Sequence, residues 1–441
     1  MSFQGEINFD GLIGSTHNYG GLSEGNLASL KNTNTTSNPR SAAIQGIEKM
    51  EILMREGIPQ GVFLPHERPY LPILKEFGYS GSPSKILEDV SKKSPKLLLN
   101  ISSASSMWAA NAATYSPSSD NTDSLVHITP ANLNTMFHRS IEAHFTYKQL
   151  LRIFKHQCFK VHAPQNNISG YGDEGAANHL RISESHLTPG IQVFVYGTGS
   201  FEKSKNAVKR QAKEISEAIA LNHNIHSQRQ FFLKQSDVAI AAGSFHNDIV
   251  SLANENIFIY HEYAFENKNE LNKLLSIIND EVSNKQIIEI KDNEINLDTI
   301  VGSYLLNSQL VTGEDGSMIL ILPEEVKKYN ECEEWLEKIL EISKIKKLIY
   351  VDIRQSMMNG GGPACLRFKT VLSNDELKNI NPKFLLNEDK VMQLKSLFNS
   401  LYRDHLNPED LQDPDLLDES YQALDRITQI FDVGNIYEFQ Q

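Results

Sequence analysis

The stretch of this sequence best suited to chemistry is residues 359–368, NGGGPACLRF, in which three glycines and a proline precede Cys365. Strand-like runs lie on both sides of it, at residues 348–353 and 366–370. Glycine permits a positive φ and a close approach of the backbone to a ligand, and a cysteine thiolate is a strong nucleophile. The pattern fits a nucleophile at the floor of a pocket. It also fits the commoner case of a tight turn before a buried structural cysteine.

Two further runs carry side chains that could assist such a cysteine. His246 and Asp248 are two residues apart in SFHNDI, at the expected start of a strand. Side chains alternate across a strand, so both should project to the same side. With Glu174, from the run GDEGAANH, they supply the parts of a thiol hydrolase: a histidine that moves protons, and carboxylates that orient it or hold a cation. A hydrogen-bonded turn is the alternative for His246 and Asp248.

The remaining cysteines and the histidine spacing argue against other kinds of site. Cys158 and Cys332 lie at helical spacing from apolar residues, which predicts core positions. Three widely spaced cysteines match neither a disulfide framework nor a CxxC zinc site, and the histidines lack the spacing of metal ligands. We therefore expect no metal and no cofactor, and a protein of the reducing cytoplasm.

Composition excludes several classes of partner. The chain has 441 residues, of which 40% are hydrophobic, and a net charge of -13, as is typical of a soluble protein with a large core. The acidic balance and the lack of a basic stripe argue against nucleic acid as a partner. No apolar run approaches the roughly 20 residues of a membrane span. The N-terminal residues lack the basic start and apolar segment of a signal peptide, so neither a leader nor a membrane anchor is expected.

Apolar periodicity predicts a mixture of strands and helices. Strands are expected at residues 4–14, 61–64, 126–129, 191–196 and 318–322, with a hairpin at 249–260. Helices are expected at residues 39–56, 84–91, 140–156, 208–221 and 324–342, and in a C-terminal stretch from 389 that is interrupted at Pro408 and Pro414. Arg210 falls in the first turn of the helix expected at 208–221.

A repeated asparagine indicates how these elements are organised. It opens units of loop, strand, turn, strand and helix, at Asn111, Asn178, Asn247, Asn307 and Asn359. The separations of roughly 50 to 70 residues are in the range of a supersecondary repeat. Five such units predict a closed ring of αβ modules whose loops converge on one axis, although a chain rich in asparagine could also show this spacing by chance.

The loop at residues 15–29, STHNYGGLSEGNLAS, is rich in glycine, serine and asparagine. Its glycines match neither GxGxxG nor a Walker loop, so a phosphate site is not expected there. The composition fits a mobile loop over a site and, nearly as well, a plain surface loop.

Long motifs along nearly the whole chain resemble the N-succinylarginine dihydrolase family, among them NFDGLIGSTHNYGGLSEGN, SSASSMWAANAATYSPS, NLNTMFHRS, SYLLNSQLVTGEDGSM and MNGGGPACLRF. The resemblance implies an α/β pentein fold: one catalytic domain over residues 1–441, a five-bladed pseudo-symmetric αβ-propeller built from five ββαβ-like modules. It also implies conversion of N-succinyl-L-arginine and two waters to N-succinyl-L-ornithine, two ammonia and carbon dioxide in arginine catabolism. The family further suggests a homodimer.

The same resemblance assigns roles to individual residues. It assigns catalysis, through a covalent thiouronium on cysteine, to Cys365, His246 and Glu174. It assigns substrate contacts to Gly20, Gly21, Leu22, Ser23, Glu24, Gly25, Asn26, Leu27, Ala28, Ser29, Asn111, His138, Arg139, Arg210, Asp248 and Asn359.

These roles agree with the chemistry of a guanidinium substrate. Carboxylates such as Asp248 can hold its N–H fork in one plane, and its positive charge favours the thiolate of Cys365. Arg139 and Arg210 can bind carboxylates in bidentate fashion, although surface salt bridges are the usual fate of arginines on helices. Three alternatives remain open: a pentein that hydrolyses once, as an arginine deiminase does, one that transfers the amidino group, and an inactive pentein that only binds.

Overall fold

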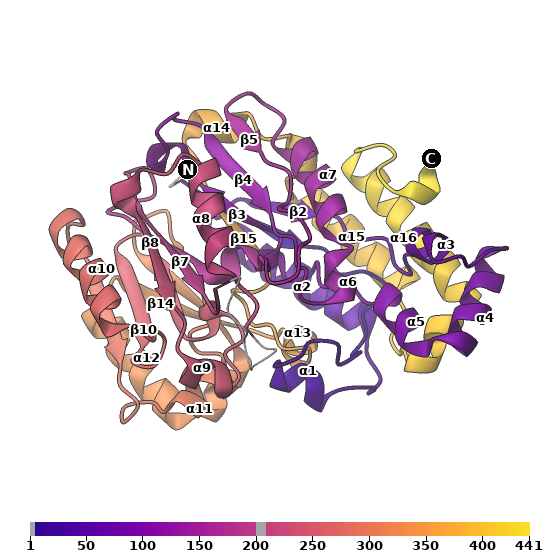
Figure 1. The fold of residues 1–441 in the computed structure, drawn as a ribbon, viewed down its shortest axis with the longest axis horizontal. Coiled ribbons are helices and arrows are strands. Elements are labelled where there is room, and N and C mark those ends of the chain that lie inside the picture. Colours follow the sequence, from indigo (N-terminus) through magenta and orange to yellow (C-terminus); the bar gives the residue numbers. More distant parts are fainter. Residues whose placement is uncertain (1–4, 200–208) are drawn as a thin grey trace.

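The computed structural model describes residues 5–199 and 209–441 of the chain. Its named strands form five three-stranded sheets with one pairing pattern: the central strand is antiparallel to the first strand and parallel to the third (Figure 1). The sheets are β3 (Ala113–Ser116), β4 (Val126–Pro130) and β5 (Phe159–Val161); β6 (His179–Ile182), β7 (Ile191–Tyr196) and β8 (Gln230–Lys234); β9 (Ser251–Asn254), β10 (Ile257–His261) and β11 (Gln286–Ile290); β12 (Gln309–Thr312), β13 (Met318–Pro323) and β14 (Ile345–Val351); and β15 (Arg367–Val371), β1 (Glu6–Gly11) and β2 (Gln60–Phe63).

The last of these sheets joins the two ends of the chain. β15 pairs with β1 so that Phe368 lies opposite Phe9. Both rings are buried, and both pack against Phe63 of β2, with ring centroids 5.8 and 5.9 Å apart. This pairing brings the strand that follows Cys365 against the N-terminal strand, although the two are far apart in sequence.

Each sheet has a helix between its second and third strands, namely α7, α8, α10, α12 and α2. In α2, the Asn38 side chain caps Ser41 N at 2.8 Å and Pro39 occupies the first turn, as helix starts favour. The helices are α1 (Leu27–Lys31), α2 (Pro39–Arg55), α3 (Leu71–Glu76), α4 (Pro83–Lys93), α5 (Pro95–Ser102), α6 (Phe137–Ser140), α7 (Ala143–Ile153), α8 (Lys213–Asn222), α9 (Asp237–Ala241), α10 (Lys268–Glu281), α11 (Leu297–Ser303), α12 (Asn330–Ile342), α13 (Arg354–Met358), α14 (Asn374–Lys378), α15 (Glu388–Leu401) and α16 (Pro414–Phe431).

Two large apolar clusters form the core. One surrounds the β15–β1–β2 sheet and reaches α2, α15 and α16, and the other lies among the sheets from β6 to β14. A smaller cluster joins α3, α4 and α5 to α16, at the end of the molecule that carries the C terminus (Figure 1). No helix in the described ranges is both long and apolar enough to cross a membrane.

Most elements expected from sequence are present with shifted ends, and a few expectations were wrong. The expected strand at 4–14 corresponds to β1. Gln4 of that strand and Val208 of the helix expected at 208–221 lie outside the described residues. That helix begins only at Lys213, so Arg210 precedes it in a loop. The helix expected at 324–342 is a 3-10 helix (Glu324–Lys328) followed by α12, because Tyr329 is extended. The helix expected at 140–156 is present as α7, with both ends shifted inward.

His246 and Asp248 do not lie on a strand. A 3-10 helix at Asn247–Ile249 precedes β9, and His246 is the extended residue before it. The Asn247 amide donates to Asn178 Oδ1 at 2.8 Å, and this contact to another sheet's loop holds the turn.

The predicted asparagine repeat is confirmed at four of its five positions. Asn111, Asn178, Asn247 and Asn307 each lie within four residues of the first strand of a sheet. Asn359 instead caps the end of α13, and in the fifth unit Cys365 stands two residues before β15, as Asn307 stands two before β12. The cysteine therefore occupies the place, two residues before the first strand, that Asn111 and Asn307 occupy in their units.

Hydrogen bonds between these loops link every unit to the next. In the described ranges, each named strand pairs only with strands of its own sheet. The bonds that connect the loops are Ala110 N to Cys365 O (3.1 Å), Asn111 Nδ2 to Glu174 O (2.7 Å), Asn247 N to Asn178 Oδ1 (2.8 Å), Asn307 Nδ2 to Asp248 O (3.1 Å) and Gly362 N to Asn307 Oδ1 (2.9 Å). Taken in order, these bonds form a closed circuit.

Candidate active site

The loops before the sheets meet at one pocket, which contains most of the residues singled out by sequence. Its lining residues are Asn18, Gly20, Gly21, Leu22, Ser23, Asn26, Ser29, Ser103, Ala104, Trp108, Asn111, His138, Arg139, Arg210, Phe245, His246, Asn359, Gly360 and Cys365. Cys365 and His246, which are far apart in sequence, thus face the same small space.

Cys365 is held in place by a backbone that packs very closely. Gly360 has a φ of +91°, and a Cβ there would lie 2.0 Å from the side-chain amide of Asn26. A Cβ on Gly361 would lie 2.1 Å from Trp108 Nε1. These glycines are required by a positive φ and by close approach, as the sequence suggested.

The thiol of Cys365 is buried between a side-chain amide and a carboxyl group. Its Sγ lies 3.3 Å from Asn307 Oδ1 and 3.4 Å from Asp248 Oδ2. Burial and the nearby Asp248 charge raise the pKa of Cys365 well above its usual value. Burial also raises the pKa of Asp248, to about 7, despite hydrogen bonds from Cys365 and Asn307. An arriving cation would favour ionisation of both groups.

His246 belongs to a buried chain of charge-assisted hydrogen bonds. His246 Nε2 lies 2.8 Å from Glu174 Oε2, and Arg139 Nη1 donates to the same oxygen at 2.7 Å. Burial alone would raise the pKa of Glu174, but the Arg139 charge and the His246 hydrogen bond hold it well below its usual value. Burial lowers the pKa of His246 to about 4 against the opposing effect of Glu174, so the imidazole is neutral near pH 7 and able to accept a proton.

Polar groups at the other side of the pocket have unused hydrogen-bonding capacity. Within the described chain, Arg210 Nε and His138 Nδ1 are buried without a partner. The Arg210 guanidinium stacks 4.8 Å from the Phe245 ring centroid and donates through Nη2 to Ser23 Oγ (3.1 Å) and Glu24 O (2.6 Å). Such groups suit an anionic part of a ligand.

The loop at residues 20–29 is fastened to the Cys365 loop by Asn359. Asn26 Nδ2 donates to Asn359 O at 3.1 Å, and Ser29 Oγ donates to Asn359 Oδ1 at 3.2 Å. Six of the ten loop residues line the pocket; Glu24, Gly25, Leu27 and Ala28 are not among the lining residues of the described chain. Asp248 and Glu174 also lie outside that lining, and they contact the lining residues Cys365 and His246 respectively.

Sequence reasoning missed several residues of the site. Asn307 was singled out only as a repeat position, although it contacts Cys365 Sγ. Trp108 lies in the run SSASSMWAANAATYSPS, one of the motifs of the family resemblance, yet it was not proposed as a site residue. The other missed lining residues are Asn18, Ser103, Ala104, Phe245 and Gly360. Gly360 and Asn18 lie in runs that sequence had marked, the glycines before Cys365 and the loop at residues 15–29. Motif spacing carries no signal for Ser103, Ala104 and Phe245, because they reach the pocket through tertiary packing.

Comparison with known proteins identifies the family of the chain. The succinylarginine dihydrolase family model matches residues 4–440. N-succinylarginine dihydrolases of Pseudoalteromonas translucida and Photorhabdus laumondii are each 44% identical to it, covering 99% of this chain and 98% and 99% of theirs. The solved structure of ArgZ, an arginine dihydrolase from cyanobacteria, shares its fold at 13% identity, with a TM-score of 0.51 over 84% of this chain and 42% of that one. The chain therefore belongs to the succinylarginine dihydrolase family.

Proposed function

We propose that the protein hydrolyses N-succinyl-L-arginine with two waters to N-succinyl-L-ornithine, two ammonia and carbon dioxide. Family membership supports this substrate, because curated relatives at 43–44% identity carry that name. The observation that carries the proposal is that Cys365, His246 and Arg139 line one pocket, with Glu174 bonded to both His246 and Arg139. Counting ammonia tests it: two per succinylarginine are expected, whereas one would indicate a deiminase and none an amidino transfer or an inactive binding protein.

We further propose that residues 1–441 form one pentein catalytic domain, a five-bladed αβ-propeller of five ββαβ-like modules. Three observations support this arrangement. The five sheets share one pairing pattern, the β15–β1 pair unites the chain ends, and the circuit of loop hydrogen bonds passes through all five units. The active site would then lie where the loops converge.

In the proposed mechanism the substrate itself activates the nucleophile. The guanidinium is placed against Asp248, whose ionised form holds the N–H fork. Its positive charge lowers the pKa of Cys365, and the thiolate attacks the guanidinium carbon. His246 takes up the proton that Cys365 loses and passes it to the departing ammonia, which leaves a thiouronium on Cys365.

Water then completes the first cycle. His246 in its neutral form removes a proton from water, which attacks the thiouronium carbon and releases N-succinylcitrulline, a urea. A second cycle at the same carbon releases another ammonia and carbon dioxide and leaves the amine of N-succinylornithine. Glu174 keeps the imidazole oriented and stabilises its protonated form between these steps.

The carboxylates of the substrate are proposed to bind at Arg210, His138 and Arg139. The free Nε of Arg210 supports this role. Arg139 already donates to Glu174, so it would serve both the substrate and the histidine. Residues 20–29 and Asn359 would enclose the bound molecule, and Asn111 would support the Glu174 loop through its 2.7 Å bond to Glu174 O.

We also propose that the protein acts in the cytoplasm as a homodimer without a cofactor. Three free cysteines suit a reducing compartment, and the family resemblance suggests the dimer. Light scattering of the purified protein tests the assembly: a mass of one chain would contradict the dimer.

The Arg210→Gln variant is expected to raise KM for succinylarginine by about 10–100-fold, the loss expected for charge-assisted hydrogen bonds to a carboxylate. Steady-state ammonia release measures this effect. Arg229→Gln is the matched control, because Arg229 pairs with Glu281 away from the pocket, and its KM should stay unchanged. Equal kinetics of the wild type on free arginine and succinylarginine would contradict carboxylate capture.

Activity should depend on the ionisation of Asp248. Its pKa is raised to about 7, so the carboxylate is neutral below that pH and charged above it. Because a cationic substrate needs the charged form, kcat/KM should rise about tenfold per pH unit below pH 7 and level off above it. A kcat/KM profile from pH 5 to 9 measures this.

Asp248→Asn should lower kcat/KM and remove this acidic limb. Asp237→Asn, which changes an exposed aspartate paired with Lys209, should keep the wild-type profile. An unchanged limb in Asp248→Asn would show that another group controls it.

A further inference from the structure

A second cavity lies directly behind Cys365. It has a volume of about 110 Å³, and a water molecule takes up about 30 Å³ in the liquid. Cys365 and Asn111 line the active-site pocket, whereas their chain neighbours Ala364 and Ala110 line this second cavity. Asp248 also lines it, and Asp248 Oδ2 lies 3.4 Å from Cys365 Sγ. The two spaces are therefore separated by the thickness of the Cys365 loop.

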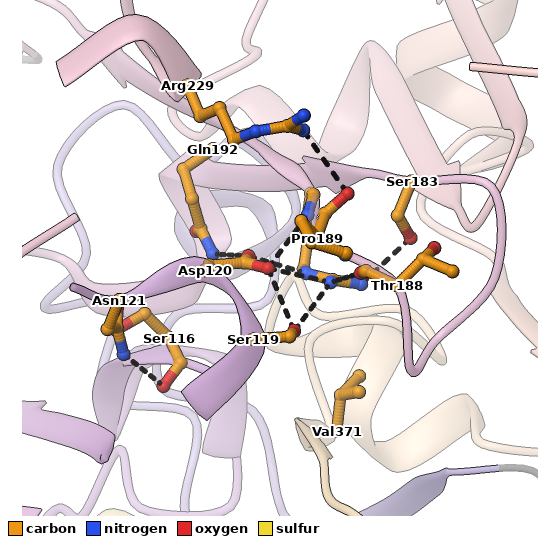
Figure 2. Close-up of polar contacts among 12 residues, drawn as sticks. Ser116, Ser119, Asp120, Asn121, Ser183, Thr188, Pro189, Gln192, Arg229 and Val371 are labelled. Atoms are coloured by element: carbon orange, nitrogen blue, oxygen red, sulfur yellow. Dashed lines mark hydrogen bonds and ion pairs between the residues drawn. The ribbon is translucent and has the colours of Figure 1, made fainter. Parts of the chain in front are cut away.

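The cavity is lined by three basic side chains, Arg181, Arg367 and Lys369. Arg181 is neutralised, since it donates through Nε (2.7 Å) and Nη2 (2.9 Å) to the two oxygens of Asp120. Figure 2 shows Asp120 at the centre of this network, with Gln192 and Ser119 beside it. The ion pair with Asp120 thus occupies Arg181 and connects β6 to the turn that contains Asp120.

Arg367 and Lys369 are not neutralised in this way. No carboxylate of the described chain lies within 4.0 Å of either, and Lys369 Nζ donates to the neutral Asn254. The guanidinium of Arg367 makes no hydrogen bond with any described residue, and its Nε is buried without a partner. Glu6, Asp10 and Asp248 are close enough to act on Arg367 through their charge, but none forms an ion pair with it. Glu6 accepts from Asn8 at 3.0 Å, and Asp10 pairs with Lys49 at 2.6 Å.

A second unpartnered group faces the same space from another sheet. Ser308 is 1% exposed and lines the cavity, and its Oγ has no partner among the described residues. Buried polar groups are normally hydrogen-bonded. An unpaired guanidinium and an unpaired hydroxyl around one small cavity are therefore the features of a site that binds a small acceptor. The planar fork of arginine matches the two oxygens of a planar oxyanion.

We propose that this cavity binds a small planar oxyanion of the carbonate class through Arg367, Lys369 and Ser308. The choice of carbonate rests on the proposed function, whose one-carbon product, carbon dioxide, equilibrates in water with bicarbonate and a proton. The cavity lies across the Cys365 loop from the pocket that would hold the reacting carbon of the substrate. It provides a place for the one-carbon product apart from the substrate pocket.

Titration calorimetry of the substrate-free protein with sodium bicarbonate at constant ionic strength tests the site. Saturable binding is expected to the wild type and to Arg426→Gln, a control on the exposed face of α16. Arg367→Gln should weaken it about tenfold or more, and Arg367→Lys by less, since a single charge replaces a bidentate fork. Undiminished binding to Arg367→Gln, or no binding to the wild type, would overturn the proposal.

Sodium nitrate, phosphate and chloride are titrated in parallel to identify the anion. Equal affinity for any of them would overturn the assignment to carbonate. If Arg367→Gln does not fold, a wild-type crystal soaked in bicarbonate decides: a planar group between Arg367 and Ser308 supports the proposal, and an empty cavity there overturns it. Because these measurements use no substrate, a protein that releases two ammonia yet binds no bicarbonate refutes this inference alone.

Discussion

Cys365→Ser should lose nearly all turnover of succinylarginine, with kcat reduced by about 10⁴-fold or more, the range seen when a covalent nucleophile is removed. A serine hydroxyl ionises far less readily than a thiol, so the substrate's charge cannot convert it to a comparable nucleophile. The fold should survive, since the substitution is nearly isosteric at a position whose neighbours are polar. Ammonia release under saturating substrate measures the effect.

Cys158→Ser is the matched control for this substitution. Cys158 is a partly exposed free thiol whose Sγ lies 3.1 Å from His156 Nδ1, away from the pocket. Its variant should keep wild-type kcat. If Cys365→Ser retained full turnover while folded, the covalent mechanism would be refuted.

Glu174→Gln should lower kcat by about 10²–10⁴-fold, by analogy with removal of the charge that orients a catalytic histidine. The carboxylate accepts hydrogen bonds from His246 at 2.8 Å and from Arg139 at 2.7 Å. A neutral amide cannot supply the negative charge that these two donors face. Removing the charge leaves Arg139 buried and unpaired, so the free energy of unfolding should also fall by about 3 kcal/mol. Turnover and denaturant unfolding, measured on the same sample, separate the two effects.

Glu419→Gln provides the comparison, because Glu419 pairs with Arg403 at 2.7 Å but is one-third exposed. It should change neither kcat nor stability by much. A Glu174→Gln protein with wild-type kcat would show that the buried carboxylate serves the fold and not the histidine.

The fivefold repetition was predictable because an asparagine precedes a strand in four of the units, and local sequence carries that signal. The position of Cys365 in the fifth unit could not be read in the same way. There the asparagine, Asn359, belongs to the end of α13, and the cysteine stands two residues before the strand, as Asn111 and Asn307 do in their units. Recognising this needed the β15–β1 pairing, which joins the chain ends.

The residues whose backbone conformation was wrongly predicted have one thing in common. Contacts with residues distant in sequence override the pattern of their local sequence. Arg210 has helix-compatible neighbours, yet its guanidinium donates hydrogen bonds to Ser23 and Glu24, which lie near the N terminus. His246 and Asp248 alternate as if on a strand, yet the bond from Asn247 to Asn178 holds a 3-10 turn. The residue types of the candidate site were therefore predictable from sequence, whereas the backbone conformations that position them were not.

The measurement that tests the central claim most directly is mass analysis of protein quenched in acid during turnover of succinylarginine. Digestion then locates any bound substrate fragment. The account predicts that the peptide containing Cys365 carries the mass of succinylarginine less one ammonia, and that the Cys365→Ser protein carries none. An adduct located on Cys158 or Cys332, or its absence across quench times while ammonia is being released, would contradict the account.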